Sequence, residues 1–235
     1  MKRIVIVGST VLSERLIYNF EETGFGKVTG MIDDFEPPKS IKYDREIMGK
    51  IKDIPELFEK DAFDYIAVAI GYHNRRFRKQ VFDYLRKLEI PIITFVHPTS
   101  IVEKNASIKK GTIILSQCII DFRAEVQENV FLSSRCFVSH HVKIKRHTYC
   151  SPAVKLAGQS EVGERCFLGI NTTVVDSVEV GDNVQTAAGA VIVKNVPSNV
   201  LVAGVPGKII KEFLKNDAGI DDNLKKAKGE NNNIE

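Results

Sequence analysis

One histidine and one glycine stand at a spacing that suits acyl transfer. Both lie inside a stretch with a six-residue period, and Gly158 follows His140 by three repeats of that period. If three repeats make one turn of the chain, the two residues lie on neighbouring turns, about 5 Å apart along the axis. An imidazole there can take a proton from an attacking amine or hydroxyl, and the glycine N–H can stabilise the tetrahedral oxyanion. The alternative interpretation of His140 is an exposed bystander.

The six-residue period defines the element that must hold these two residues. Fourteen of the 16 residues found at steps of six from Val102 to Ile192 are Val, Ile or Leu, and the residue four places further on is always small or β-branched. Neither a helix nor a single strand has this period. It indicates a solenoid in which the aliphatic residue fills the interior and the small residue fits the corner, with three hexads in each three-sided coil.

The four cysteines follow the same register. Cys118, Cys136 and Cys166 occupy the small position and Cys150 the inward position, and the chain contains no CxxC pair. We therefore interpret them as inert core residues rather than metal ligands, redox groups or nucleophiles. The sequence predicts no metal site.

The first 97 residues have a different pattern. Apolar β-branched runs at residues 3–8, 28–34, 65–71 and 91–96 predict strands, and residues 11–20 and 74–87 have helical spacing. Alternating strands and helices predict a small Rossmann-like parallel α/β sheet. The loop after the first strand contains one glycine, so it lacks the dinucleotide fingerprint and argues against an NAD enzyme.

Polar residues follow three of these strands, where ligands of parallel sheets usually bind. They are Ser9 and Thr10, then Asp33 and Asp34, and then His73 in the segment that begins at Gly71. Asp33 and Asp34 could accept hydrogen bonds from a base or ribose, and Ser9 and Thr10 could donate toward phosphate. Equally, the aspartates could simply end a strand and Thr10 could cap a helix. His97 is expected to be structural and His147 to be a solvated surface residue.

The order of the two parts, and several short stretches, resemble a family of hexapeptide-repeat sugar acetyltransferases. This family comprises sialic acid O-acetyltransferases and bacillosamine-pathway nucleotide-sugar N-acetyltransferases. The matching stretches are Ile32-Asp33-Asp34-Phe35, Ala69-Ile70-Gly71, His97-Pro98, Cys166-Phe167-Leu168-Gly169-Ile170-Asn171 and Val202-Ala203-Gly204-Val205-Pro206-Gly207-Lys208. The resemblance implies a left-handed parallel β-helix and a homotrimer with active sites between subunits. It also implies acetyl-CoA as donor and a role in polysaccharide biosynthesis.

Carried over residue by residue, the resemblance implies a site in three parts. His140 is the general base, with Gly158 as oxyanion donor. The family usually has Asp or Glu where this chain has His141, and often Asn at Ser133, so what orients His140 stays open and His141 is a candidate to share its role. The nucleotide contacts are Thr10, Val11, Leu12, Asp33, Asp34 and Gly71, with Val11-Leu12 replacing a Gly-His pair. The donor contacts are Tyr149, Ile170, Ala188 and Lys208.

Three functions follow as hypotheses. The first is an acetyl-CoA-dependent N-acetyltransferase acting on an amino group of a nucleotide-linked deoxy sugar by direct attack on the thioester. The second is an O-acetyltransferase of a sialic-acid-type sugar, and the third is a non-catalytic binding or scaffold homologue, suggested by His141.

Composition limits the partners and the setting. Lys+Arg minus Asp+Glu is 33 − 30 = +3, so charge does not indicate nucleic acid as a partner. The apolar runs are too short for a membrane span and the start does not resemble a signal peptide, so we expect a cytoplasmic protein. We expect domains at residues 1–97 and 98–196, then an extension at 197–215 with a short helix at 209–214, and a disordered tail at 216–235.

Overall fold

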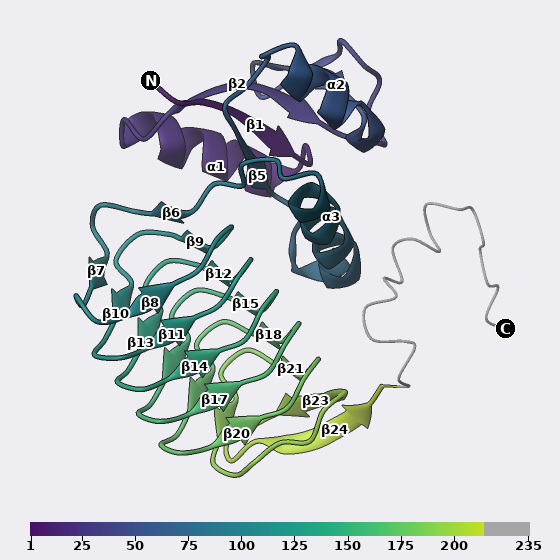
Figure 1. Ribbon diagram of the computed structural model, residues 1–235. Helices are drawn as coiled ribbons and strands as arrows, with labels where there is room; N and C mark the ends of the chain where they lie inside the picture. Colours follow the sequence, from purple (N-terminus) through teal and green to yellow (C-terminus); the bar gives the residue numbers. More distant parts are fainter. Residues whose placement is uncertain (214–235) are drawn as a thin grey trace, which may run out of the picture.

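The structure, a computed structural model, describes residues 1–213. An α/β domain lies against the first coils of a three-faced parallel β-helix (Figure 1). The predicted parts at residues 214–235, including the end of the expected helix and the tail, lie outside the described residues.

The α/β domain has a parallel sheet in the order β3-β4-β2-β1-β5, in which only the β3–β4 hairpin is antiparallel. Helix α1 buries Ser13, Leu16, Ile17 and Phe20, a spacing that gives one continuous face for packing on the sheet. The sequence pattern did not reveal the β3–β4 hairpin or α2, which are short. The elements are β1 Arg3–Val7, α1 Val11–Glu22, β2 Lys27–Ile32, β3 Ile41–Lys42, β4 Arg45–Gly49, η1 Ile51–Asp53, α2 Ile54–Glu59, β5 Tyr65–Val68, η2 Tyr72–Asn74 and α3 Arg75–Lys87.

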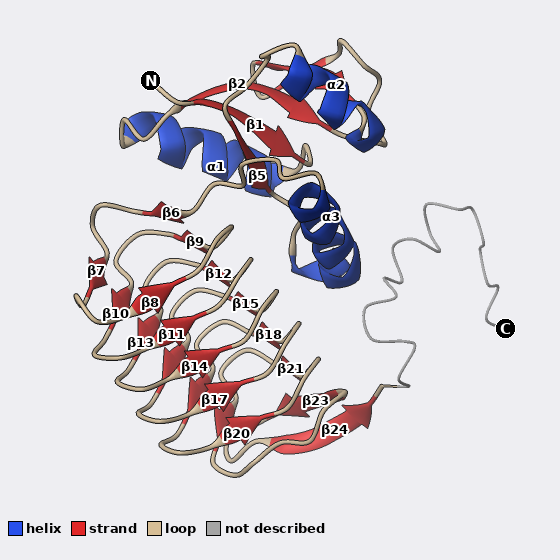
Figure 2. Cartoon of the chain, in the orientation of Figure 1, coloured by secondary structure: helices blue, strands red, loops and turns tan. Residues whose placement is uncertain are grey.

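The solenoid confirms the predicted coil of three hexads. Each strand pairs with the strand that lies three hexads away in the sequence, as in Ile119 with Phe137 and Phe137 with Lys155. Short strands alternate with turns around the whole coil (Figure 2). Every sixth residue from Gln117 to Asn183 has a positive φ, so each corner turns through one left-handed backbone residue.

We call the three sheets of the solenoid its first, second and third faces. The first face is β6, β9, β12, β15, β18, β21 and β23, with β24 antiparallel at its end; the second is β7, β10, β13, β16, β19 and β22; the third is β8, β11, β14, β17 and β20. Their bounds are β6 Phe95–Val96, β7 Ile101–Val102, β8 Ser107–Ile108, β9 Ile113–Ile114, β10 Ile119–Ile120, β11 Glu125–Val126, β12 Phe131–Leu132, β13 Phe137–Val138, β14 Lys143–Ile144, β15 Tyr149–Cys150, β16 Lys155–Leu156, β17 Glu161–Val162, β18 Phe167–Leu168, β19 Thr173–Val174, β20 Glu179–Val180, β21 Gln185–Thr186, β22 Val191–Ile192, β23 Val200–Ala203 and β24 Lys208–Glu212.

Two expected elements differ in the structure. Of the predicted strand at 91–96, only Ile92 bridges the α/β sheet, whereas Phe95–Val96 pairs with β9 of the solenoid. The predicted helix at 209–214 is wrong over its described part, because Lys208–Glu212 forms an antiparallel strand. The free edge of β23 offers that segment backbone partners, which outweigh its local helical spacing. We keep residues 1–97, 98–196 and 197–215 as proposed domain limits; β6, which pairs with the solenoid, lies at the end of the first of these ranges.

The first face is covered by the α/β domain. Its outward side chains include Ile113, Phe131 and Tyr149, which are buried in one cluster with Leu16 and Phe20 of α1. The Phe131 and Tyr149 rings stack at 4.6 Å between centroids. The two domains therefore share a continuous apolar core, which holds the carboxyl ends of β1, β2 and β5 in a constant position over the solenoid.

Candidate active site

His140 lies on the turn that follows β13, at the corner between the second and third faces. Its imidazole covers Gly158 of the next coil. A methyl group added to the Cα of Gly158 would lie 2.4 Å from Cε1 and 2.5 Å from Nε2 of His140. The imidazole therefore occupies the space that any larger residue at position 158 would need.

The backbone around Gly158 leaves one amide available. The Ala157 N–H donates to Val174 O, and the Gln159 N–H donates to His140 O. Among the backbone hydrogen bonds of residues 1–213, none uses the N–H of Gly158. An exposed imidazole thus lies next to a glycine whose amide is free to bind an oxyanion.

His141 is the polar neighbour of His140. The two Nδ1 atoms are 3.3 Å apart, and the His141 ring packs edge-on against Phe122 of the preceding coil. A hydrogen bond across this contact requires one Nδ1 to carry a proton and the other to lack it. If the His140 Nδ1–H donates to His141, Nε2 of His140 is left unprotonated and can act as the base. No carboxylate within 4.0 Å replaces the family's acid in the described part of the chain.

Three of the four expected donor contacts line one cavity. Tyr149, Ile170 and Ala188 surround a hollow of about 330 Å³ at the corner between the first and second faces. Tyr149 is largely buried and stacked on Phe131, whereas Ile170 is 54% exposed. Lys208 starts the exposed strand β24 and is not part of this lining.

His140 and this cavity lie at different corners of the same solenoid. His140 follows β13 of the second face, while Ile170 and Ala188 follow β18 and β21 of the first face. The width of the second face separates the two corners within one chain. One chain by itself therefore does not bring the imidazole to the donor cavity.

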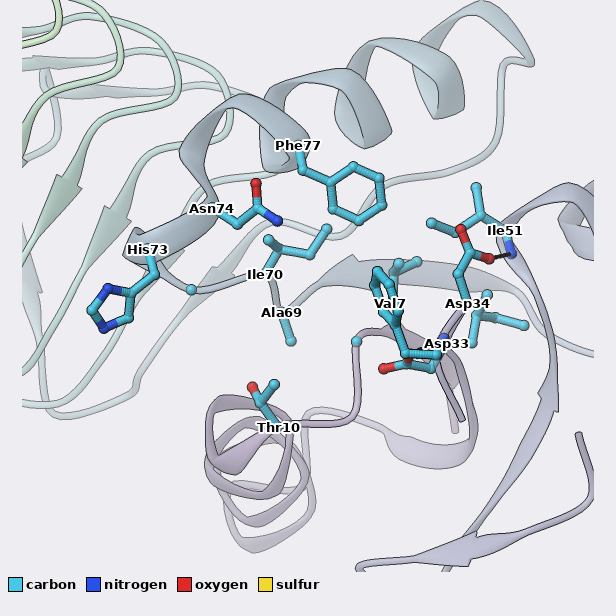
Figure 3. Close-up of a pocket in the computed structure, with 14 residues that line it drawn as sticks. Val7, Thr10, Asp33, Asp34, Ile51, Ala69, Ile70, His73, Asn74 and Phe77 are labelled. Atoms are coloured by element: carbon cyan, nitrogen blue, oxygen red, sulfur yellow. Dashed lines mark hydrogen bonds between the residues drawn. The ribbon is translucent and has the colours of Figure 1, made fainter. Parts of the chain in front are cut away.

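A second cavity of about 330 Å³ opens at the carboxyl ends of β1, β2 and β5 (Figure 3). It collects Thr10, Asp33, Asp34 and Gly71 of the expected nucleotide contacts. The remaining three lie elsewhere: Ser9 is buried and donates to Asp33 Oδ2 at 2.7 Å, Val11 is 72% exposed, and Leu12 packs toward the solenoid.

Both aspartates hold the backbone around the cavity. The Phe35 N–H donates to Asp33 Oδ1, and the Ile51 N–H donates to Asp34 Oδ1 at 2.9 Å. Thr10 precedes α1 without a side-chain capping bond, so its hydroxyl remains free. Asp33 and Asp34 can therefore hold the backbone at the strand end and also bind a ligand, because a carboxylate that accepts one backbone hydrogen bond still has lone pairs for another donor.

The sequence interpretation did not identify Phe77 as a lining residue. Its ring points into the cavity, whereas the His73 imidazole lies at the outer edge and points away (Figure 3). Phe77 belongs to the helical pattern of α3, which is typical of ordinary packing. Only the position of α3 beside the strand ends gives this ring an exposed face over the cavity.

The expectation that His147 is a solvated surface residue is wrong. His147 is 1% exposed, with Nδ1 2.9 Å from Asn129 Nδ2 and its ring against Phe82 of α3. Arg78, also fully buried, directs Nη1 toward the His147 carbonyl. Burial, together with the nearby Arg78 cation, lowers the pKa of His147 to about 3. The repeat alone predicts that this corner is exposed to solvent, but α3 of the α/β domain covers it.

We predict an acid-sensitive stability from His147. Its pKa is lower in the folded state than in the unfolded chain, so below about pH 6.5 only the unfolded state takes up the proton. Stability should therefore fall as the pH falls, by roughly 3 kcal/mol between pH 6.5 and 4. Urea unfolding of wild type and His147→Gln over this range should give a clearly flatter profile for the variant. His97→Gln is the control, and equal slopes for wild type and His147→Gln would contradict the assignment.

The cysteines are confirmed as core residues. All four are buried free thiols. Burial raises the pKa of Cys150, and raises that of Cys166 to about 12, so neither forms a thiolate nucleophile near neutral pH.

Within residues 1–213, no group of three or more His, Cys, Asp or Glu side chains is arranged to hold a metal ion. The helices of this described region are all too short or too polar to cross a membrane.

The solenoid has relatives among known proteins. Residues 159–194 match the bacterial transferase hexapeptide (six repeats) model. Over 46 residues the chain is 48% identical to 2,3,4,5-tetrahydropyridine-2,6-dicarboxylate N-acetyltransferase of Enterococcus faecalis, covering 20% of each protein. Over 52 residues it is 40% identical to the putative lipopolysaccharide biosynthesis O-acetyl transferase WbbJ of Escherichia coli, covering 22% of this chain and 26% of that protein. The chain thus spans only about a quarter or less of the length of these curated relatives.

Solved structures match nearly the whole chain. PerB of Caulobacter crescentus, solved with CoA and GDP-perosamine, gives a TM-score of 0.82 at 24% identity, covering 90% of this chain and 98% of that one, and a mutant of this GDP-perosamine N-acetyltransferase gives 0.83. The acetyltransferase domain of PglB from Neisseria gonorrhoeae gives 0.80 at 21% identity, covering 89% and 100%. The predicted resemblance and the α/β domain followed by a left-handed parallel β-helix are thereby confirmed.

Proposed function

We propose that this protein is an acetyl-CoA-dependent N-acetyltransferase that acts on the amino group of a nucleotide-linked amino-deoxy sugar. The observation that carries the proposal is the imidazole of His140 over the free amide of Gly158. The structural neighbour bound to CoA and GDP-perosamine supports the two substrate classes. The four free thiols are consistent with a reducing cytoplasmic setting, which we include in the proposal.

In this mechanism the amine attacks the thioester carbonyl directly. Nε2 of His140 takes a proton from the nitrogen as the N–C bond forms. The Gly158 N–H donates to the oxyanion of the tetrahedral intermediate. When the C–S bond breaks, the proton on His140 passes to the departing CoA sulfur. His141, which stands where the family usually has an acid, would hold His140 in the tautomer that leaves Nε2 free.

The acceptor nucleotide is assigned to the cavity at the strand ends. Thr10 at the start of α1 supplies a free hydroxyl beside backbone amides, an arrangement that suits phosphate. Asp33 and Asp34 have remaining lone pairs for ribose or base donors, and Phe77 offers an aromatic face. Tyr149, Ile170 and Ala188 are assigned to the acetyl-CoA thioester end, and Lys208 to its distal phosphates.

The separation of His140 from the donor cavity supports an active site shared between copies. In a cyclic trimer, one surface of each copy contacts a different surface of the next copy. The corner that carries His140 in one copy can therefore meet the corner that carries the donor cavity in its neighbour. The second face, which joins those corners, exposes Ile101, Ile119 and Phe137. An apolar row of this kind on a β-helix is suited to burial against another copy.

The shared site predicts complementation between two inactive variants. We expect His140→Ala, which lacks the base, and Ala188→Trp, which fills the donor cavity, each to be inactive alone. Co-expressed with different tags, they should form mixed trimers in which about one of the three sites combines an intact His140 with an intact cavity, whichever variant supplies two of the copies. Thiol release by the purified mixed trimer is the measurement. A mixture without activity would contradict a site between subunits.

The function itself is tested by thiol release from acetyl-CoA over a panel of acceptors. Nucleotide-linked 4-amino and 3-amino sugars should release CoA, and the product should carry an amide-linked acetyl group by mass spectrometry. An O-acetyltransferase is the second candidate, because WbbJ matches part of the solenoid. Release with free sialic acid and an ester product would select it. No release with any acceptor would favour the non-catalytic homologue.

A further inference from the structure

Arg15 crosses the seam between the two domains. It lies on α1, whose buried residues are Ser13, Leu16, Ile17, Asn19 and Phe20. The guanidinium points to the solenoid instead, with Nη1 3.2 Å from Ser133 Oγ and Nη2 2.9 Å from Ser134 Oγ. Both partners are neutral hydroxyls. Within the described region, no carboxylate lies within ion-pair distance of Arg15.

This guanidinium also lines the donor cavity. Arg15, Ser133, Ser151 and Thr186 supply its polar lining, and Tyr72 and Phe167 form an aromatic wall. The Tyr72 and Phe167 rings stack at 4.3 Å. A half-buried cation with only neutral partners keeps an unbalanced charge beside a partly enclosed space. Guanidinium groups in such places bind carboxylate or phosphate oxygens through paired N–H donors.

The cavity of Arg15 adjoins the nucleotide cavity. Thr10 lines the latter and precedes Arg15 by five residues, about 7.5 Å along the axis of α1. The segment after β5 also joins the two spaces, because Tyr72 lines one and His73 the other. An acceptor that begins in the nucleotide cavity and extends toward the solenoid along this side can therefore reach the guanidinium.

We propose that Arg15 forms an anion subsite for the acceptor at this seam, on the α/β-domain side of the cavity whose solenoid side, with Ile170 and Ala188, is assigned to the thioester. The inference rests on the proposed function only for the identity of the acceptor. The ligand chemistry is an anionic oxygen pair, supplied either by the diphosphate of a nucleotide sugar or by a carboxylate on the sugar. Arg15 thereby selects charged acceptors, and neutral free sugars bind poorly.

Calorimetric titration without acetyl-CoA tests the subsite apart from the acetyl transfer. The probes are GDP, UDP, guanosine, uridine and N-acetylneuraminate. If the diphosphate is the ligand, Arg15→Gln should bind GDP or UDP about tenfold or more weakly and bind the nucleosides unchanged. If a carboxylate is the ligand, the variant should lose affinity for N-acetylneuraminate alone. Arg15→Lys should restore part of the affinity, because it keeps the charge without the paired donors.

Two variants distinguish anion binding by Arg15 from a purely structural role, in which Arg15 only links the two domains. Ser134→Ala removes the shorter contact and keeps the cation, so its affinities should stay near those of wild type. Arg76→Gln removes an exposed arginine of α3 and is the matched charge control. Wild-type affinities in Arg15→Gln, no binding of any probe by wild type, or equal losses in Ser134→Ala and Arg15→Gln would each overturn the proposal. Retained binding without thiol release would remove the proposed function and leave the subsite intact.

Discussion

Replacing His140 by alanine is expected to lower kcat by about 10²- to 10⁴-fold, the usual contribution of a general base. The KM values for both substrates should change little, because His140 is proposed to contact the reacting nitrogen, whereas the residues assigned to the nucleotide and to CoA line other surfaces. The measurement is thiol release at saturating acetyl-CoA and acceptor. An enzyme that keeps its full rate without this imidazole would exclude His140 as the base.

Chemical rescue sharpens this test. His140→Ala leaves an open space over Gly158, because the imidazole fills the volume next to that glycine. Added imidazole should therefore restore part of the rate in His140→Ala. Variant His140→Asn, which keeps a polar side chain in the same space, should not be rescued. Similar responses of the two variants to imidazole would show that the loss has a cause other than the missing base.

The second large effect is expected from Gly158→Ala. The new methyl group would lie within 2.5 Å of two ring atoms of His140, closer than real contacts allow. The imidazole must swing outward, and a displacement of about 1 Å at a reacting group can lower the rate by about 10²-fold. The coil itself should remain folded, because the conflict is with an exposed side chain that can move.

Two measurements isolate this effect. The thermal unfolding midpoint of Gly158→Ala should stay close to that of wild type while kcat falls. Gln159→Ala, at the next position of the same turn, is the matched control and should retain most of the activity. A Gly158→Ala enzyme with normal kcat would mean that the imidazole does not work from the position over Gly158.

The burial of His147 could not be predicted from the repeat alone. His147 and Asn129 occupy the same place in consecutive coils, three hexads apart, and the period correctly puts both at a corner. Yet both are buried, because α3 of the other domain covers that corner. The outward aromatic residues Phe131 and Tyr149 gave a signal for such a covered face, since a solvated wall does not need stacked rings.

The C-terminal strand has a related explanation. Residues 208–212 have local spacing compatible with a helix, but the last parallel strand of the first face leaves an unpaired edge. Pairing with that edge satisfies backbone groups of both segments. Residues 208–212 thus form a strand because β23 lies beside them, and the local pattern of residues 208–212 contains no information about β23.

By itself, the sequence determined the coil of three hexads, the order of the two domains, and the proximity of His140 to Gly158. These follow from burial of one aliphatic residue in each hexad, a constraint that acts along the chain at short range. Only the tertiary structure decided that Arg15 reaches Ser133 and that His140 lies a full face away from the donor cavity. Those results depend on how separately formed surfaces dock, and docking brings together residues more than a hundred positions apart, such as Arg15 and Ser133.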